Sequence, residues 1–242
     1  MIVDAASKGP VYLSLVLPTY NEKANIAAVI KQLCHELDKA VPGRYELIVV
    51  DDDSPDRTWE VAQSLISRYP PLTVIRRQGE RGLATAVIRG WQAAKGEVLG
   101  AIDADLQHPP DALPKLLSAM GTSGMAIATR HIAGGGVSDW SFGRRLISRG
   151  AQLLGLIILP RVVGRVSDPL SGYFLVRRSV IAGRELNPVG YKILIEVLAR
   201  GEQQKISEVG YVFRERQKDA SKANLKIYAE YVIHLVNLRL RR

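Results

Sequence analysis

Two aspartates separated by a single residue follow a short apolar run in the middle of the chain. Asp103 and Asp105 come directly after the run 98–102, and Pro109 and Pro110 prevent a strand from continuing beyond them. We therefore expect both carboxylates at the carboxyl end of a buried strand. Mg²⁺ and Mn²⁺ prefer oxygen ligands and often bind one or two carboxylates together with substrate phosphates. The spacing predicts a metal-assisted site for a phosphate-bearing substrate, and the alternative is a solvated acidic turn.

Two further polar segments also follow predicted strands. Pro-Thr-Tyr-Asn-Glu at 18–22 comes after a β-rich run at 12–17, and Asp-Asp-Asp-Ser at 51–54 comes after the apolar run 47–50. The remaining predicted elements are helices at 22–37, 58–69, 83–95 and 110–120 and strands at 72–76 and 125–129. Such alternation is typical of a mostly parallel sheet covered by helices, which binds ligands beyond the carboxyl ends of its strands. We therefore interpret this rim of the sheet, with its three polar segments, as the active site.

The composition indicates one domain, with or without a long appendage, and an uneven distribution of charge. The chain has 242 residues, of which 47% are hydrophobic, and no apolar run approaches the roughly 18–20 residues of a membrane span. We see no secretory signal, and the single cysteine, Cys34, excludes an intrachain disulfide framework. Residues 1–129 carry 13 Lys and Arg against 15 Asp and Glu, whereas residues 130–242 carry 20 against 9. The second half therefore suits an anionic partner, either phosphates, nucleic acid or a membrane surface.

Several function classes lack their sequence signatures. No Gly-x-Gly-x-x-Gly follows the first predicted strand, no Walker-type Gly-x-x-x-x-Gly-Lys is present, and no His/Cys cluster has zinc spacing. A dinucleotide oxidoreductase and a P-loop NTPase are therefore disfavoured. The net charge of +9 suggests a nucleic-acid-binding module, but aromatic residues make up only 6% of the chain and no recognised binding motif occurs. We therefore expect no nucleic-acid partner.

Four blocks of sequence carry a family resemblance. They are 18–22 (Pro-Thr-Tyr-Asn-Glu), 50–58 (Val-Asp-Asp-Asp-Ser-Pro-Asp-Arg-Thr), 103–110 (Asp-Ala-Asp-Leu-Gln-His-Pro-Pro) and 167–174 (Ser-Asp-Pro-Leu-Ser-Gly-Tyr-Phe). Together with Arg216 and Lys222, these blocks resemble the inverting glycosyltransferase family 2, and more closely its polyprenol- and dolichol-phosphate mannose synthases. The resemblance covers about residues 13–222, nearly the whole chain.

The resemblance implies an α/β fold of the GT-A type. This fold is Rossmann-like, with a mostly parallel central sheet flanked by helices and with C-terminal helices that face the acceptor and the membrane. The implied catalytic domain covers 1–225, with a nucleotide-sugar half at about 11–130 and an acceptor half at about 131–225. A basic amphipathic helix would follow at 226–242.

The resemblance also implies the residues of a nucleotide-sugar site. The guanosine pocket would be lined by Pro18, Tyr20, Glu22, Val50 and Asp52. The metal and the diphosphate would be surrounded by Asp103, Ala104, Asp105 and Gln107, with Asp103, Asp105 and Gln107 as ligands of Mg²⁺ or Mn²⁺. Arg130 matches an arginine of the family after its fifth strand, although His131 stands where the family usually has tyrosine. Arg216 and Lys222 would bind the diphosphate, where Arg binds bidentately and Lys acts as a point charge.

The reaction that the resemblance implies is transfer of mannose from GDP-mannose to dolichyl or polyprenyl phosphate. The acceptor phosphate attacks the anomeric carbon with inversion, and GDP leaves. A phosphate is already an anion at neutral pH, so catalysis needs positioning and charge stabilisation rather than a base. Asp105 would act through the metal, and Arg130, Arg144 and Arg145 would hold the acceptor phosphate, unless the Arg144–Arg145 pair is ordinary basic surface. The alternative is transfer of glucose or another hexose from a UDP-sugar on the same fold.

A lipid acceptor requires contact with a membrane, and two segments suit that contact. Both 142–159 and 227–240 combine apolar residues with arginine or lysine, as helices in a lipid interface do. Alternatively, each helix packs on the core of the protein or leads toward membrane spans. We expect peripheral binding at the cytoplasmic face of the membrane. Many relatives continue into transmembrane helices, so a membrane-anchoring domain or subunit could complete the enzyme.

Overall fold

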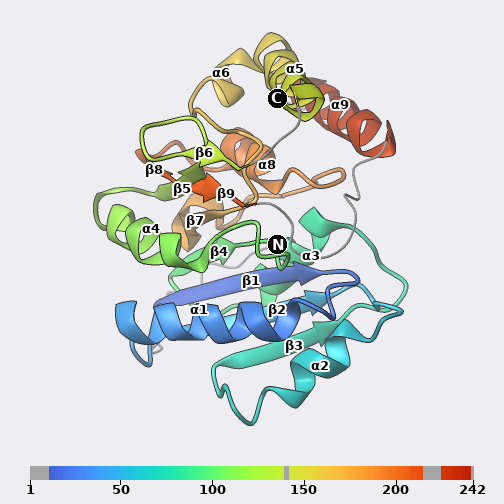
Figure 1. Ribbon diagram of the computed structural model, residues 1–242. Coiled ribbons are helices and arrows are strands. Elements are labelled where there is room, and N and C mark those ends of the chain that lie inside the picture. Colours follow the sequence, from blue (N-terminus) through green and yellow to red (C-terminus); the bar gives the residue numbers. More distant parts are fainter. Residues whose placement is uncertain (1–10, 139–141, 215–224, 241–242) are drawn as a thin grey trace.

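A mostly parallel sheet of seven strands forms the centre of the protein (Figure 1). The computed structural model describes residues 11–138, 142–214 and 225–240, and it leaves the side chains of 142–146 and 225–228 undescribed. The strand order is β3-β2-β1-β4-β7-β5-β8, and β7 alone runs antiparallel to its neighbours in this described sheet. The strands are β1 (Leu13–Thr19), β2 (Tyr45–Asp51), β3 (Leu72–Arg76), β4 (Val98–Ala101), β5 (Met125–Thr129), β7 (Phe174–Arg177) and β8 (Ile206–Gly210). Two short strands, β6 (Gly136–Val137) and β9 (Val212–Phe213), pair in parallel beside this sheet.

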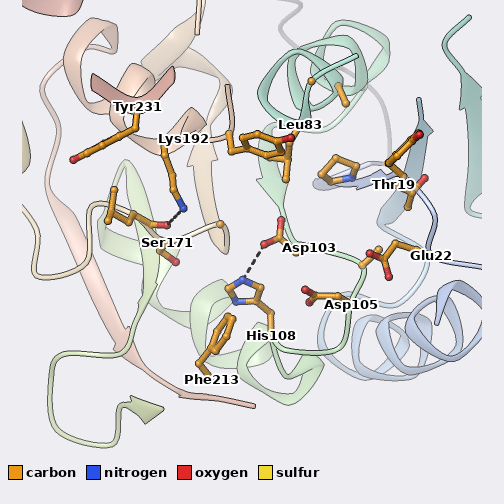
Figure 2. A pocket seen from close by; sticks show the side chains of 18 of the residues that line it. Thr19, Glu22, Leu83, Asp103, Asp105, His108, Ser171, Lys192, Phe213 and Tyr231 are labelled. Atoms are coloured by element: carbon orange, nitrogen blue, oxygen red, sulfur yellow. Dashed lines mark hydrogen bonds and ion pairs between the residues drawn. The ribbon is translucent and has the colours of Figure 1, made fainter. Parts of the chain in front are cut away.

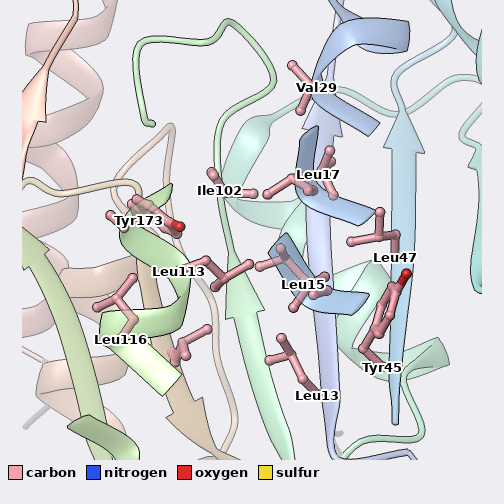
Figure 3. Close-up of a cluster of buried hydrophobic side chains, with 14 of the residues drawn as sticks. Leu13, Leu15, Leu17, Val29, Tyr45, Leu47, Ile102, Leu113, Leu116 and Tyr173 are labelled. Atoms are coloured by element: carbon pink, nitrogen blue, oxygen red, sulfur yellow. The ribbon is translucent and has the colours of Figure 1, made fainter. Parts of the chain in front are cut away.

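Helices cover both faces of the sheet, so its central strands are buried on both sides. Every residue of β1 and β2 is buried, which explains their nearly continuous apolar sequences. Alternate side chains of β1 enter two separate cores: Leu15 and Leu17 pack toward one face and Val16 toward the other. Figure 3 shows the first core, where side chains of β1 meet Val29 of α1 and Leu113 of α4.

The helices divide between these two cores. The first core is covered by α1 (Ile26–Ala40), α2 (Thr58–Ser64) and α4 (Leu113–Ala119), the last of which lies between the short 3₁₀ helices Pro110–Ala112 and Met120–Thr122. The second core is covered by α3 (Leu83–Ala93), α6 (Pro160–Val163), α7 (Arg178–Ile181), α8 (Ile193–Arg200) and α9 (Leu225–Leu240). This two-layer covering confirms the α/β class expected from the sequence.

The strand order reverses between β1 and β4. The chain passes from β1 to β2 and β3 on one side and then returns to place β4 on the other side of β1. Loops that leave the carboxyl ends of two such strands diverge, and the crevice between them is where open α/β sheets bind ligands. Residues 18–22 and 102–108 leave the sheet on the two sides of this crevice.

Two long helices lie side by side at one end of the molecule (Figure 1). α5 (Phe142–Ile158) contacts α9 through Tyr231, whose hydroxyl donates to the carbonyl oxygen of Ala151 at 2.9 Å. Gly155 makes this approach possible, since a Cβ there would lie 2.6 Å from the Tyr231 hydroxyl. Across the parts of the chain that the structure describes, no helix combines the length and hydropathy of a membrane span.

A buried histidine joins α9 to α8. His234 is 1% exposed, and its Nε2 lies 3.4 Å from Oε2 of Glu196, which is itself fully buried. Burial and the positive charge of Arg200 lower the pKa of His234 to about 4, from an ordinary value of 6.5. His234 is therefore neutral in the folded protein at neutral pH.

Acidification is expected to destabilise the protein through His234. Its pKa is lower in the folded than in the unfolded state, so the unfolded state binds more protons between pH 6.5 and 4 and stability is lost as pH falls through that window. The loss from this residue between pH 7 and pH 5 is about 2 kcal/mol. Urea unfolding of the wild type and His234→Asn at the two pH values measures it. If the free energy of unfolding of both proteins depended equally on pH, the lowered pKa of His234 would be contradicted.

Candidate active site

A cavity of about 470 Å³ opens at the carboxyl ends of β1 and β4, where the strand order reverses. All three polar segments predicted from the sequence contribute to its wall. The predicted site residues that line it are Pro18, Tyr20, Glu22, Asp52, Asp103, Ala104, Asp105 and Arg130. Residues far apart in the sequence thus meet at one rim because parallel strands end at the same edge of a sheet.

Asp103 and Asp105 lie at the centre of the cavity wall (Figure 2). They follow β4 on a turn in which Oδ1 of Asp105 accepts a hydrogen bond from the backbone N–H of Gln107 at 3.1 Å. Leu106, between Asp105 and Gln107, has a φ of 61°, a left-handed conformation that is costly for a branched side chain and that sharpens the turn. This turn directs two carboxylates toward the same space.

The carboxylate pair fits a divalent cation that is shared with a substrate. Within residues 11–138, 142–214 and 225–240, no three His, Cys, Asp or Glu side chains converge as a metal cage. Mg²⁺ commonly binds one or two carboxylates and completes its coordination with waters and substrate phosphates. Gly172 keeps the space in front of Asp103 open, because a Cβ at this position would lie 2.8 Å from Oδ2 of Asp103.

His108 contacts Asp103 within the wall of the cavity. Its Nε2 lies 3.3 Å from Oδ2 of Asp103, and its ring is 4% exposed. The rings of Tyr173, Tyr211 and Phe213 surround it, with centroids 5.1–5.6 Å from the imidazole centroid. His108 belongs to the block 103–110 that carries the family resemblance, and the structure places it against a predicted metal ligand.

Arg130 is held in the cavity wall by a buried carboxylate. Its Nε and Nη2 donate to the two carboxylate oxygens of Asp168, both at 2.7 Å. Burial alone would raise the pKa of Asp168, but the hydrogen bonds and charge of Arg130 outweigh it and keep this pKa below its ordinary value. The same pair raises the pKa of Arg130 in spite of burial. Arg130 therefore carries a permanent positive charge in a fixed orientation.

Lys192 brings a second positive charge into the cavity. It precedes α8, lines the cavity, and its Nζ donates to the carbonyl oxygen of Leu170 at 3.2 Å (Figure 2). Burial lowers the pKa of Lys192, and the charge of Arg130 lowers it further, whereas Asp103 and Asp168 oppose the shift. A half-buried ammonium near Arg130 gains from a bound anion. Sequence reasoning missed this residue, because a lysine before an apolar helix carries no distinguishing signal.

Asp52 reaches the cavity as part of a hydrogen-bonded network. Its Oδ1 accepts from Nε of Arg77 at 2.7 Å, and its Oδ2 accepts from the backbone N–H of Gly82 at 2.8 Å. These bonds fix the loop between β3 and α3 against the end of β2. On the same loop, the guanidinium carbon of Arg81 lies 4.5 Å from the ring centroid of Tyr20, a cation–π distance. The loop and Tyr20 together frame one end of the cavity.

The other predicted site residues have different positions. Val50 is fully buried in the core, and Gln107 is 6% exposed, with Nε2 donating to the carbonyl oxygen of Arg214 at 3.2 Å. Arg144 and Arg145 belong to α5, but their side chains lie outside the described part of the structure. Arg216 and Lys222 also lie outside the described residues.

Comparisons with known proteins give relatives over nearly the whole chain. Residues 14–183 match the sequence model of Glycosyl transferase family 2. A dolichol-phosphate mannosyltransferase of Pyrococcus furiosus is 47% identical over 228 residues, which cover 93% of this chain and 63% of that protein. The chain thus spans less than two thirds of this relative's length. A dolichol-phosphate mannosyltransferase of Saccharomyces cerevisiae is 34% identical over 234 residues, covering 93% and 86% of the two chains.

The fold is shared with more distant enzymes. The crystal structure of glucosyl-3-phosphoglycerate synthase from Mycobacterium tuberculosis in complex with Mn²⁺, UDP-glucose and phosphoglyceric acid matches with a TM-score of 0.66. The match covers 98% of this chain and 81% of that chain at 20% sequence identity. At this identity, the match establishes the fold alone.

Proposed function

Because the chain belongs to glycosyl transferase family 2, we propose that it transfers mannose from GDP-mannose to dolichyl or another polyprenyl phosphate. The observation that carries the proposal is the cavity in which the Asp103–Asp105 pair faces Arg130 and Lys192. A carboxylate pair suits the metal-bound diphosphate of a sugar nucleotide, and two fixed cations suit an acceptor phosphate. Two relatives named dolichol-phosphate mannosyltransferase support the sugar and the lipid class.

The leaving group is assigned to the side of the cavity formed by Asp103 and Asp105. Mg²⁺ or Mn²⁺ held there would act as a Lewis acid toward the departing diphosphate. Gln107 is proposed as a third ligand through its amide oxygen, since its amide nitrogen is bonded to Arg214. Arg216 and Lys222 are proposed to bind the same diphosphate.

The nucleophile is assigned to the side of the cavity formed by Arg130 and Lys192. A phosphate monoester is anionic at neutral pH, so the chain needs to bind and orient it rather than deprotonate it. Asp168 keeps Arg130 charged and oriented for this task. Arg144 and Arg145 are proposed to extend the acceptor site along α5. In this arrangement inversion follows from attack on the face of the sugar opposite to the diphosphate.

Replacing Lys192 with methionine is expected to lower kcat/KM for transfer about a hundredfold, the lower end of the loss for one preorganised electrostatic group. Methionine keeps most of the side-chain volume and removes the charge. Lys192→Arg should restore part of the activity, because the charge remains. Lys115→Met is the matched control, since Lys115 is exposed on α4 and away from the cavity. Wild-type kinetics for Lys192→Met would contradict the role assigned to this residue.

The surface formed by α5 and α9 supports a lipid acceptor. Each helix packs one face on the protein and exposes apolar side chains on another. The exposed side chains are Ile147, Leu153, Leu156 and Ile157 of α5 and Val232, Ile233, Val236 and Leu240 of α9. Ala151 and Tyr231, where the helices meet, line the cavity. A polyprenyl chain bound at its phosphate could therefore leave the cavity directly onto this apolar surface.

We propose that this α5–α9 surface lies in the lipid interface at the cytoplasmic face of a membrane. Apolar helix faces beside basic residues bind such interfaces, and anionic lipids strengthen the binding. The double variant Ile157→Glu/Ile233→Glu is expected to reduce co-flotation with vesicles containing anionic lipid at least about tenfold, since each change replaces apolar burial with a charge. Ile66→Glu is the control, because Ile66 is 40% exposed and follows α2, a helix at the opposite end of the molecule from α5 and α9 (Figure 1). Equal flotation of both variants would contradict the membrane assignment.

Calorimetric titration with GDP-mannose and UDP-glucose, each with and without Mg²⁺ or Mn²⁺, tests the donor. Tighter, metal-dependent binding of GDP-mannose is the expected result. Metal-dependent binding of UDP-glucose, without binding of GDP-mannose, would instead indicate hexosyl transfer from a UDP-sugar. Binding of neither nucleotide sugar would contradict the proposed site.

A further inference from the structure

The turn that precedes Lys192 is held by a histidine of the C-terminal helix. Nδ1 of His234 accepts a hydrogen bond from the backbone N–H of Val189 at 3.0 Å. An imidazole nitrogen that accepts a hydrogen bond carries no proton, so the proton of the neutral ring lies on Nε2. This Nε2 faces Oε2 of Glu196 at 3.4 Å. One ring thus links α9, α8 and the turn.

Glu196 holds the same turn at a second point. Its Oε1 accepts hydrogen bonds from the backbone N–H of Asn187 and from Nε of Arg200, both at 2.7 Å. Asn187 and Val189 are therefore both bonded by the His234–Glu196 pair, whose two side chains are 0–1% exposed. Two backbone groups of the turn depend on a buried polar pair that lies outside the cavity.

The turn then passes between α9 and α3 before it enters the cavity. Gly190 has a φ of 74°, and a Cβ there would lie 2.9 Å from Oε2 of Glu230 on α9. The carbonyl oxygen of Gly190 accepts from the N–H of Ala84 in α3 at 3.4 Å. Tyr191 and Lys192, the next two residues, line the cavity. The backbone between the histidine-bonded Val189 and Lys192 is thus short and confined.

We propose that His234 is a positioning residue: by holding Val189 it fixes the turn that places the Lys192 ammonium in the cavity. The proposal rests on the proposed function only where it assigns Lys192 to the substrate phosphate. Since His234 lies on α9 beside the exposed Ile233, its hydrogen bond to Val189 couples the position of this helix to the turn before Lys192. A displacement of about 1 Å at a reacting group can cost up to a hundredfold in rate.

Two substitutions separate the hydrogen bond from the volume of the ring. His234→Phe keeps the ring and removes the acceptor, whereas His234→Asn offers an amide oxygen near the position of Nδ1. We expect His234→Phe to lower kcat/KM about tenfold and His234→Asn to remain within about threefold of wild type. Hydrogen exchange of the 187–192 peptide should be faster in His234→Phe and close to wild type in His234→Asn. Leu238→Ala is the control for a weakened α9, since Leu238 is an apolar side chain of α9 that is buried in the second core.

A double-mutant cycle with Lys192→Met tests the path of the effect. If His234 acts through Lys192, the double variant His234→Phe/Lys192→Met should lose about a hundredfold, no more than Lys192→Met alone. Additive losses of about a thousandfold would show a general structural role and overturn the proposal. Leu238→Ala should be additive with Lys192→Met. The same cycle can be read as the Kd of the polyprenyl phosphate, since Lys192 is assigned to this phosphate. A wild type that binds this acceptor without transferring mannose contradicts the proposed function, while the coupling between His234 and Lys192 is still measured.

Discussion

Asp105→Ala is expected to reduce the turnover number of mannosyl transfer at least about a thousandfold. The substitution removes one of two carboxylates that face the same space beyond β4, and with it a principal ligand for the cation at the diphosphate. Loss of a main electrostatic stabiliser costs about 10²–10³-fold, and a metal ligand affects both cation binding and the leaving group. Initial rates at saturating donor and acceptor, measured across a range of Mg²⁺ or Mn²⁺ concentrations, test this prediction.

Glu97→Gln is the matched control for Asp105→Ala. Glu97 precedes β4 at its amino end, is exposed, and pairs with Arg177 at 2.7 Å, so the same strand carries a carboxylate that is remote from the cavity. Its activity should match wild type. Unchanged turnover of Asp105→Ala at low metal concentration would rule out the metal role of this residue.

Asp168→Ala is expected to lower the free energy of unfolding by about 3–5 kcal/mol, the cost of leaving a buried charge without its partner. Asp168 is 1% exposed, and the Arg130 side chain is 9% exposed, so water cannot replace the lost carboxylate. Urea unfolding at pH 7 measures the change. Glu97→Ala, which breaks the exposed pair with Arg177, should cost no more than about 1 kcal/mol.

A double variant separates the effect of charge from that of packing at the Arg130–Asp168 pair. Asp168→Leu combined with Arg130→Met should recover much of the stability, because removing both members of a buried pair costs far less than removing one. The double variant should remain inactive, since the acceptor phosphate loses a fixed cation. A loss below 1 kcal/mol in Asp168→Ala would contradict the description of Arg130 as a buried, paired charge.

The first half of the fold could be predicted because each element has a local signal. The strands expected at 72–76 and 125–129 have those bounds in the structure, and the apolar run at 47–50 is the buried centre of β2. The predicted ends of the helices were less accurate. The helix expected at 58–69 ends at Ser64, and the helix expected from residue 22 begins at Ile26, because turns stabilised by local hydrogen bonds replace the helix there.

The strands of the second half carry few local signals in the sequence. β7 has four residues, runs antiparallel and lies between β4 and β5, and neither its direction nor its place follows from so short a run. β8 pairs with β5 although a long stretch of chain separates them. Such placements come from tertiary packing rather than from local propensity. By contrast, the expected helix at 142–159 corresponds closely to α5.

The candidate site likewise contains residues with local sequence signals and residues that only tertiary packing positions. Polar residues that directly follow strands, such as Asp103 and Asp105, could be placed because strand ends share one rim of the sheet. Lys192 could not, since its position depends on a turn held by His234 from the end of the chain. The pairing of Arg130 with Asp168 could not be predicted either, although Asp168 lies in the block 167–174 and Arg130 matches an arginine of the family. Residues positioned by distant contacts become recognisable only in three dimensions.

The central claim is tested most directly by incubating the protein with labelled GDP-mannose, a polyprenyl phosphate in detergent, and Mg²⁺ or Mn²⁺, and then measuring label in the lipid phase. Labelled UDP-glucose serves as the parallel donor. We predict lipid-linked mannose that requires both the metal and the acceptor phosphate. Label from UDP-glucose alone, or no lipid-linked label from GDP-mannose with nucleotide binding intact, would contradict the account.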